Sequence, residues 1–174
     1  MGEMLDIYDN NRIKMGAAQA RGRKRKKAEN ILVVMVLIFN EAGEMLIQKR
    51  SPYAIWSPDM WTMTAGGAVL AGETPTKAAS RELYEELGIK IDFTNSRLKF
   101  TMTDKNAFLD YFIVRANVDL STLNVPNEEV AAAKWASKEE MLTMIDRGEC
   151  MPYRKSFLEF CFDCADMMEC TLTK

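Results

Sequence analysis

The sequence predicts one mixed α/β domain, and three observations indicate this class. The length of 174 residues suits a single well-packed core and is short for two. A continuous apolar run of nine residues, Ile31–Phe39, is typical of a buried strand. A later segment, Thr74–Gly88, carries helix signals at both ends. Strand and helix patterns therefore occur together in one chain.

Strands before the helix are predicted from apolar runs bounded by turn residues. Ile31–Phe39 and Glu44–Arg50 flank the turn Asn40–Gly43, which favours an antiparallel hairpin. Short strands are expected at Trp61–Thr64 and Ala68–Leu70, on either side of a glycine pair.

The helix itself is marked by its first and last residues. Thr74 can cap it, Pro75 suits its first position and Gly88 suits the residue just past its end. Between these signals, apolar residues recur every four positions and predict the core-facing stripe: Ala79, Leu83 and Leu87.

The chain after the helix predicts three more strands and two helices. Leu98–Thr103 and Phe108–Asn117 flank a polar turn, and Lys134–Ala136 is a short last strand. Helical spacing then predicts helices at Lys138–Arg147 and Tyr153–Met168.

Three glutamates crowd one side of the predicted helix: Glu82, Glu85 and Glu86. At roughly 100° per residue their side chains fall within an arc of about 100° beside the apolar stripe. Like charges at this spacing cost roughly 0.2–0.5 kcal/mol per pair, and anions near a helix C-terminus are also disfavoured. A hard divalent cation is the compensating partner that this arrangement predicts.

The segment Gly67–Ile89 resembles the signature of the Nudix hydrolases. In that signature a glycine and a glutamate precede an Arg-Glu pair, a Glu-Glu pair and a final glycine at fixed spacings. A chance match in a chain of this length is on the order of one in a million. Every fixed position is filled: Gly67, Glu73, Arg81, Glu82, Leu83, Glu85, Glu86, Gly88 and Ile89.

The resemblance implies a fold and a reaction. The fold is the Nudix α/β/α sandwich with a central mixed β-sheet, over roughly residues 30–150. The reaction is that of a Mg²⁺-dependent Nudix pyrophosphohydrolase, with Mn²⁺ as a substitute cation, in which metal-activated water attacks a diphosphate linkage. The expected partner is a small-molecule diphosphate substrate, by default a nucleoside diphosphate derivative.

Site residues follow from the same resemblance, position by position. Arg81 and Glu73 are expected to pair and hold the loop against the helix. The three carboxylates are also the catalytic candidates. The implied metal ligands are one backbone carbonyl and three side chains: Gly67, Glu82, Glu85 and Glu86.

Four residues outside the signature are further candidates. Glu129, with its neighbour Glu128, lies in a late loop from which many Nudix hydrolases take a further metal ligand or the general base. Glu128 is also a candidate for substrate binding, and the alternative interpretation is that both residues are exposed acids in a turn. Arg50 is a candidate for contact with a substrate phosphate, although a surface ion pair is the favoured reading, and Trp61 is a candidate for stacking on the substrate.

A second resemblance links the chain to isopentenyl-diphosphate isomerase, within the same superfamily. Leu5–Asn10 and Asn40–Ser51 look like that branch. The isomerase, however, uses a cysteine after a stretch similar to Trp61–Thr64, and metal-binding histidines. Ala65–Gly67 occupies that place, and the chain contains 0 histidines. An isomerase-like enzyme is therefore the alternative to hydrolysis, and a non-catalytic nucleotide-binding domain is a third hypothesis.

Residues 1–29 are predicted to form an N-terminal extension, with a hairpin and a basic segment, before the Nudix domain at residues 30–174. Arg21–Lys27 contains six basic residues out of seven. This segment could hold polyphosphate or RNA, but a solvated connector is favoured because no aromatic residue interleaves the charges. A nucleic-acid partner is therefore disfavoured, and the oligomeric state stays open between monomer and homodimer.

The chain is expected to be cytoplasmic and not to enter a membrane. Its longest apolar run has nine residues, whereas about 20 are needed to span a bilayer. In a reducing compartment its cysteines are expected to be free thiols, with Cys161 and Cys164 packed on the last helix. A zinc site is disfavoured because histidine is absent. The four cysteines are Cys150, Cys161, Cys164 and Cys170.

Overall fold

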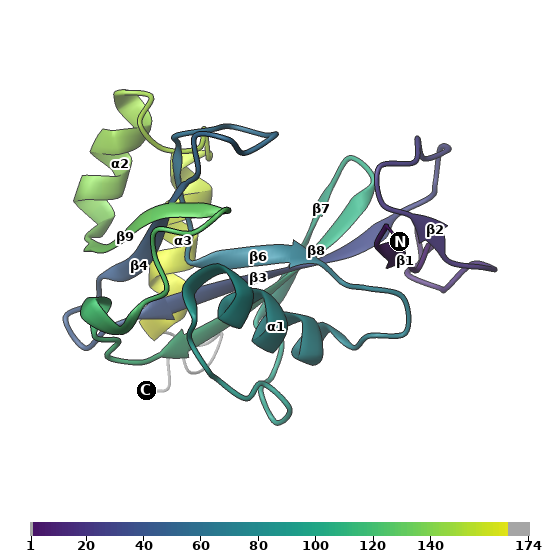
Figure 1. Ribbon diagram of the computed structural model, residues 1–174, viewed down its shortest axis with the longest axis horizontal. Coiled ribbons are helices and arrows are strands. Elements are labelled where there is room, and N and C mark those ends of the chain that lie inside the picture. Colours follow the sequence, from purple (N-terminus) through teal and green to yellow (C-terminus); the bar gives the residue numbers. More distant parts are fainter. Residues whose placement is uncertain (1, 167–174) are drawn as a thin grey trace, which may run out of the picture. The chain divides into compact units, whose positions relative to one another are not determined.

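A computed structural model describes residues 2–166 of the chain (Figure 1). The described residues fall into two compact units. Strands β3, β6 and β8 and helix α1 each continue from one unit into the other. Unit 1 contains residues through Val36, Gly66–Glu85 and Ile89–Phe112, and unit 2 contains Leu37–Ala65, Glu86–Gly88 and the residues from Ile113 on.

Unit 1 carries the N-terminal hairpin, most of helix α1 and the β7–β8 hairpin. Antiparallel pairing joins β1 to β2 and β7 to β8, and Phe100 of β7 pairs with Tyr111 of β8. The elements with residues in this unit are β1 (Met4–Leu5), β2 (Gln19–Ala20), β3 (Ile31–Phe39), β6 (Ala65–Ala68), α1 (Pro75–Leu87), β7 (Phe100–Asp104) and β8 (Ala107–Arg115).

Unit 2 is built around strand β4. The end of β3 pairs with β4 at Phe39 and Met45, as the hairpin prediction requires, and β4 also pairs antiparallel with β5 and β9. Phe39 contacts Phe162 of α3 edge to face, with ring centroids 5.2 Å apart. The further elements of this unit are β4 (Met45–Arg50), β5 (Trp61–Thr62), the 3₁₀ helix η1 (Leu120–Thr122), β9 (Val130–Ala136), α2 (Lys138–Asp146) and α3 (Lys155–Asp166).

The predicted α/β class with a central mixed sheet is confirmed. Hydrogen bonds order the strands as β5-β4-β3-β8-β7, with β6 on β3 and β9 on β4. One predicted strand was wrong: residues 65–68 form β6, and Leu70 makes only an isolated bridge to Leu5. The last strand, β9, is longer than predicted. The described helices reach 13 residues at most, and none is both long and apolar enough to cross a bilayer.

The N-terminal residues contribute to the core of unit 1. Leu5 and Ile7 are 1 % and 2 % exposed and cluster with Ile31 and Ala68. Leu5 follows Met4, whose carbonyl accepts a hydrogen bond of 2.8 Å from the backbone N–H of Ala71. Residues before the predicted domain boundary are thus packed and hydrogen-bonded against the segment that leads into α1.

Three cysteines of unit 2 are buried and form no disulfide, as predicted: Cys150, Cys161 and Cys164. Burial raises the pKa of Cys150 to about 11 and that of Cys161 to about 12, so both thiols stay protonated at neutral pH. Cys170, and the end of the predicted last helix, lie outside the described residues.

Candidate functional site

Helix α1 begins and ends where the sequence signals place it. The backbone N–H of Lys77 donates to Thr74 Oγ1 at 3.3 Å, and Pro75 is the first helical residue. Gly88 follows the helix with φ of +75°, a conformation that glycine adopts without strain. The predicted stripe is fully buried, because Ala79, Leu83 and Leu87 are all 0 % exposed.

Arg81 is the centre of a charged cluster in unit 1. Its guanidinium donates to both carboxylate oxygens of Glu73, at 3.0 and 2.9 Å, and to the carbonyl of Ala68 at 3.0 Å. It also donates to Glu82 at 2.7 Å and to Glu85 at 2.9 Å. One planar cation therefore ties the loop before α1 to two of the three glutamates on the helix.

The cluster shifts the pKa values of its members. The hydrogen bonds from Arg81 to Glu73, and then to Glu82 and Glu85, raise the pKa of the guanidinium above its usual value. Burial alone would raise the pKa of Glu73. The bonds that Glu73 accepts from Arg81 and from the backbone N–H of Leu70 outweigh burial and leave its pKa below the usual value. Both groups are charged at neutral pH.

Glu82 approaches the backbone of Gly67 so closely that a side chain at that position would require the Glu82 carboxylate or the strand to move. A Cβ atom added at Gly67 would lie 2.2 Å from the Glu82 carboxyl carbon. The glycine of the signature therefore has a steric role in unit 1: it admits the Glu82 carboxylate. Glu82 itself is only 8 % exposed.

Glu86 belongs to unit 2, and its side chain has a partner of another kind. Gln48 of β4 donates from Nε2 to Glu86 Oε2 at 2.7 Å, and both residues are at least 95 % buried. Asn127 donates from Nδ2 to the backbone carbonyl of Glu86 at 2.9 Å. The carboxylate is thus held by an uncharged amide, and its backbone is held by the loop before β9.

Sequence reasoning missed Gln48 and Asn127. Gln48 directly follows the apolar residues of a buried strand, which is a weak signal for a functional polar group. Asn127 was part of the loop proposed to carry Glu128 and Glu129, but those acids were the residues singled out. Neither partnership could be derived from spacing, because 38 and 41 residues separate the partners.

The mutual repulsion of the three glutamates was expected to be offset by a bound cation, but a side chain of the protein offsets part of it. Glu82 and Glu85 share the guanidinium of Arg81, a counter-charge that the energetic argument did not include. Glu85 has a side chain 52 % exposed, whereas Glu82 and Glu86 are buried more deeply than an edge position implies. Among residues 2–166, no group of three or more His, Cys, Asp and Glu side chains has an arrangement that could hold a metal ion.

Glu128 and Glu129 lie in the loop before β9, and both are exposed. The backbone N–H of Glu129 donates to Asn127 Oδ1 at 2.9 Å, and its carbonyl accepts from Ser51 N–H at 2.8 Å. Asn127, two residues earlier, bonds the Glu86 carbonyl. This loop therefore connects the end of α1 with the residue that follows β4.

Arg50 and Trp61 already have partners in unit 2. Arg50 donates from Nε to the carbonyl of Trp56 at 2.8 Å and so braces the loop that follows β4. Lys134 Nζ lies 4.8 Å from the centre of the Trp61 ring, so one face of that ring makes a cation–π contact. Tyr53 and Trp56, in the loop between them, are 90 % and 78 % exposed.

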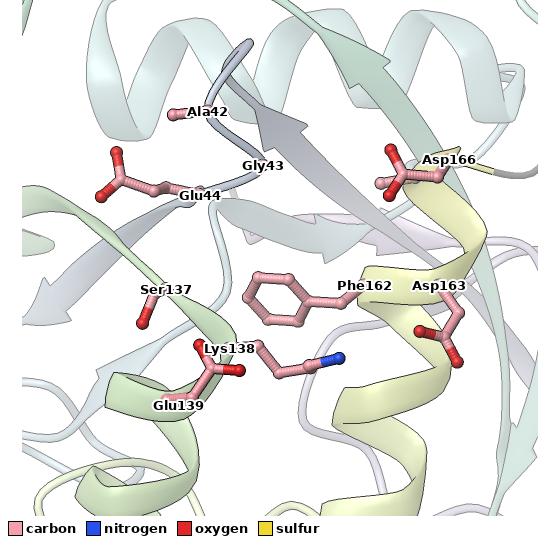
Figure 2. A pocket seen from close by; sticks show the side chains of 10 residues that line it. Ala42, Gly43, Glu44, Ser137, Lys138, Glu139, Phe162, Asp163 and Asp166 are labelled. Carbon is pink, nitrogen blue, oxygen red and sulfur yellow. The ribbon is translucent and has the colours of Figure 1, made fainter.

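A pocket of about 230 Å³ in unit 2 is lined by none of the predicted site residues (Figure 2). Its walls come from the turn before β4, the start of α2 and the end of α3. Among the described residues that line the pocket, Lys138 is the only basic one, whereas four carry carboxylates: Glu44, Glu139, Asp163 and Asp166. This charge disfavours a diphosphate substrate, so the pocket is not assigned to the reaction.

Comparison with known proteins identifies the family. Residues 29–154, well over half of the chain, match the family model described as the NUDIX domain. The chain belongs to the Nudix family. A Listeria monocytogenes protein named as an uncharacterised Nudix hydrolase is 42 % identical over 151 residues, which cover 87 % of this chain and 89 % of the relative. Relatives named as Nudix hydrolases support the predicted enzyme class, a Nudix pyrophosphohydrolase.

Two further comparisons bear on the fold and on the isomerase resemblance. The crystal structure of the Deinococcus radiodurans protein DR0079 matches with a TM-score of 0.76 and 26 % identity, over 91 % of this chain and 99 % of that one. An isopentenyl-diphosphate Delta-isomerase from Streptomyces coelicolor is 33 % identical over 86 residues, 49 % of this chain and 44 % of the isomerase. The resemblance of this Nudix chain to isomerases is therefore real but partial.

Proposed function

We propose that this Nudix enzyme is a Mg²⁺-dependent hydrolase that cleaves the diphosphate linkage of a nucleoside diphosphate derivative. Nudix hydrolases generally use divalent metals. The observation that carries the proposal is the complete signature on a well-formed helix, with Glu82 and Glu86 buried and a third carboxylate, Glu85, on the same helix.

The oxygen chemistry of these donors suits a hard divalent cation, although residues 2–166 contain no ready cluster of three such side chains. Mg²⁺ prefers carboxylate and other oxygen ligands and keeps several waters, so one or two buried carboxylates are sufficient. Glu82, Glu85 and Glu86 are the residues that would hold it, with the carbonyl of Gly67. When bound, the cation would neutralise phosphate charge, lower the pKa of a bound water and align that water for attack.

The surrounding residues would keep these groups in place. Arg81 holds Glu82 through a bond of 2.7 Å while it anchors Glu73 and the loop before the helix. Gln48 holds the Glu86 carboxylate. Glu129, on an exposed loop, is our candidate for the general base, which would take a proton from the attacking water. The buried and bonded positions favour preorganisation, which is the main contribution of protein groups to phosphoryl transfer.

An isomerase-like activity on an allylic diphosphate is the second candidate, because of the similarity to the Streptomyces coelicolor isomerase. Its chemistry requires a cysteine near β6 and metal-binding histidines. Ala65–Gly67 has no cysteine, and the chain has 0 histidines. Hydrolysis is therefore the favoured reaction.

The deciding experiment is a release assay with Mg²⁺ against nucleoside diphosphate sugars, dinucleotides, nucleoside triphosphates and isopentenyl diphosphate. We expect phosphorylated products from at least one nucleoside diphosphate derivative, and loss of that activity in Glu86→Gln. Glu139→Gln, on the exposed start of α2, is the matched control and should retain activity. Turnover that is absent from all hydrolytic substrates, or unchanged in Glu86→Gln, would contradict the proposal.

A further inference from the structure

Gln48 makes one hydrogen bond with its side chain and leaves its other polar atom unpaired. Nε2 donates to Glu86 Oε2 at 2.7 Å. Oε1 is buried and has no hydrogen-bond partner. The residue is 3 % exposed, so bulk water does not satisfy this acceptor. A buried carbonyl oxygen without a donor is costly, and native proteins seldom leave one in that state unless a ligand or ordered water completes it.

The orientation of the Gln48 amide is determined by its neighbour. Nε2 of Gln48 donates to Oε2 of Glu86, so the NH₂ side of the amide faces the carboxylate. The opposite orientation would place two acceptor oxygens against each other. Because Nε2 faces the carboxylate, the acceptor Oε1 is directed away from the carboxylate oxygen.

The backbone of Gln48 is held on both sides. Gln48 pairs with Thr62 of β5 and with Ala133 of β9, so β4 is an interior strand at this point. The sheet hydrogen bonds fix the backbone of Gln48, and the bond from Nε2 to Glu86 fixes its amide, so Oε1 cannot turn toward another donor while that bond is kept. The missing donor must therefore come to Gln48, which is the condition for a binding group with a preset geometry.

We propose that Gln48 is a positioning residue for the bound cation. Nε2 fixes the Glu86 carboxylate, and Oε1 accepts a hydrogen bond from a water that the cation carries. The inference depends on the proposed function, because it assumes that Glu86 is a metal ligand. It adds a residue outside the signature, and it explains why the last buried position of strand β4 is polar. Groups that orient metal ligands commonly change metal affinity 10–100-fold when removed.

Binding of Mn²⁺ alone, measured by calorimetry or by electron paramagnetic resonance, tests this role without turnover. Gln48→Met keeps the approximate volume of the side chain and removes both polar atoms. We expect its Mn²⁺ affinity to be about 10–100-fold lower than that of the wild type. Thr64→Val is the matched control, since Thr64 is 0 % exposed and its hydroxyl bonds the backbone of Ile38 and Leu46. It should bind Mn²⁺ as the wild type does, even if it melts at a lower temperature.

A double-mutant cycle separates positioning from general destabilisation. In a Glu86→Gln background, Gln48→Met should change Mn²⁺ affinity less than it does in the wild type, because the ligand that Nε2 positions is already altered and only the contact of Oε1 remains to be lost. Equal effects of Gln48→Met with and without Glu86 would overturn the role assigned to Nε2.

The wild-type protein also provides a test that needs no variant. The chain has two glutamines, Gln19 and Gln48, so labelling glutamine side chains with ¹⁵N gives two amide signals. Mn²⁺ should broaden the Gln48 signal first. Gln19, whose side chain bonds Glu29, is the internal control. Equal broadening of both signals, or broadening of Gln19 alone, would overturn the inference.

The outcomes distinguish the two proposals. If the wild type hydrolyses its substrate with Mg²⁺ and Glu86→Gln does not, while Gln48→Met binds Mn²⁺ normally, only the role of Gln48 is overturned. If the wild type neither binds Mn²⁺ nor shows cation-dependent turnover, the proposed function itself fails.

Discussion

Glu82 and Glu86 are both buried glutamates of α1, but their surroundings differ in charge. In unit 1, Glu82 bonds the guanidinium of Arg81, which also bonds Glu73 and Glu85. In unit 2, Glu86 bonds the neutral amide of Gln48. Arg81 brings a positive charge to Glu82, whereas Gln48 binds Glu86 through an uncharged amide. We infer that the first arrangement favours stability of the loop and helix, and that the second favours cation binding.

Among the three glutamates, Glu85 is the most exposed and Glu86 the most buried. Separate replacement of these two residues is expected to give the largest difference in activity. Glu86→Gln should lower kcat by about two to three orders of magnitude, because the loss of a metal-binding charge removes several kcal/mol of transition-state stabilisation. Glu85→Gln should lower it by about tenfold, since this side chain is half exposed and shares Arg81. Steady-state kinetics with saturating Mg²⁺ measure both. Equal losses of kcat in the two variants would contradict the inference that the surroundings of Glu86 favour cation binding.

Removal of Arg81 is expected to give the largest loss of stability. Arg81→Ala leaves Glu73 and Glu82, whose side chains are 14 % and 11 % exposed, without their shared cation. We expect the free energy of unfolding to fall by about 3 kcal/mol, measured by urea denaturation. The control is Arg21→Ala, because the Arg21–Glu3 pair is exposed at 58 % and 44 %. That variant should lose less than about 1 kcal/mol, and a similar loss in both would contradict the special role of the cluster.

Gly67→Ala tests the close approach of Glu82 to the backbone. The added methyl group would meet the Glu82 carboxylate, so either Glu82 or the strand must move. We expect a loss of about 1–3 kcal/mol in the free energy of unfolding, together with weaker Mn²⁺ binding. Gly2→Ala, where no atom lies within 4 Å of the new Cβ, should change neither quantity. An unperturbed Gly67→Ala protein would show that Glu82 can relax freely.

The smallest expected effect is a pH dependence that belongs to Glu73. Its pKa is lowered from an ordinary value of 4.5, so the Glu73–Arg81 pair stabilises the fold fully above that pH and loses its contribution as the pH falls through the lowered pKa. The stability difference between wild type and Glu73→Gln should therefore be larger at about pH 7 than at about pH 3.5. Urea titrations at both values measure it. A difference that is independent of pH would contradict the assigned charge state.

The helix and its signature were predictable because their signals are local. Thr74, Pro75 and Gly88 define the ends of α1 within the segment itself, and the buried stripe follows from spacing alone. The error at Ala68–Leu70 has a related origin. Short apolar stretches do not determine where a strand begins, and β6 begins at Ala65, before the residues whose apolar character suggested it.

The partners of the glutamates were less predictable because they come from distant parts of the chain. Spacing within the helix could suggest that Arg81 meets Glu85, four residues away. It could not indicate that Gln48 meets Glu86, since that contact depends on which face of β4 is buried and on the pairing of β4 with two other strands. The roles of Glu128, Glu129 and the basic segment Arg21–Lys27 stay predictions.

The packing of the N-terminal residues determines where segments of two related proteins can be joined to make a chimera. The family match begins at residue 29, yet Leu5 and Ile7 fill the cluster around Ile31 and Ala68. Asp6, between them, accepts a hydrogen bond of 3.0 Å from the backbone N–H of Gly72, one residue before Glu73. In a chimera joined at the family boundary, N-terminal residues from one protein would therefore pack against the hydrophobic cluster of another. The unit that can be exchanged between relatives is expected to be longer than the stretch by which those relatives are recognised.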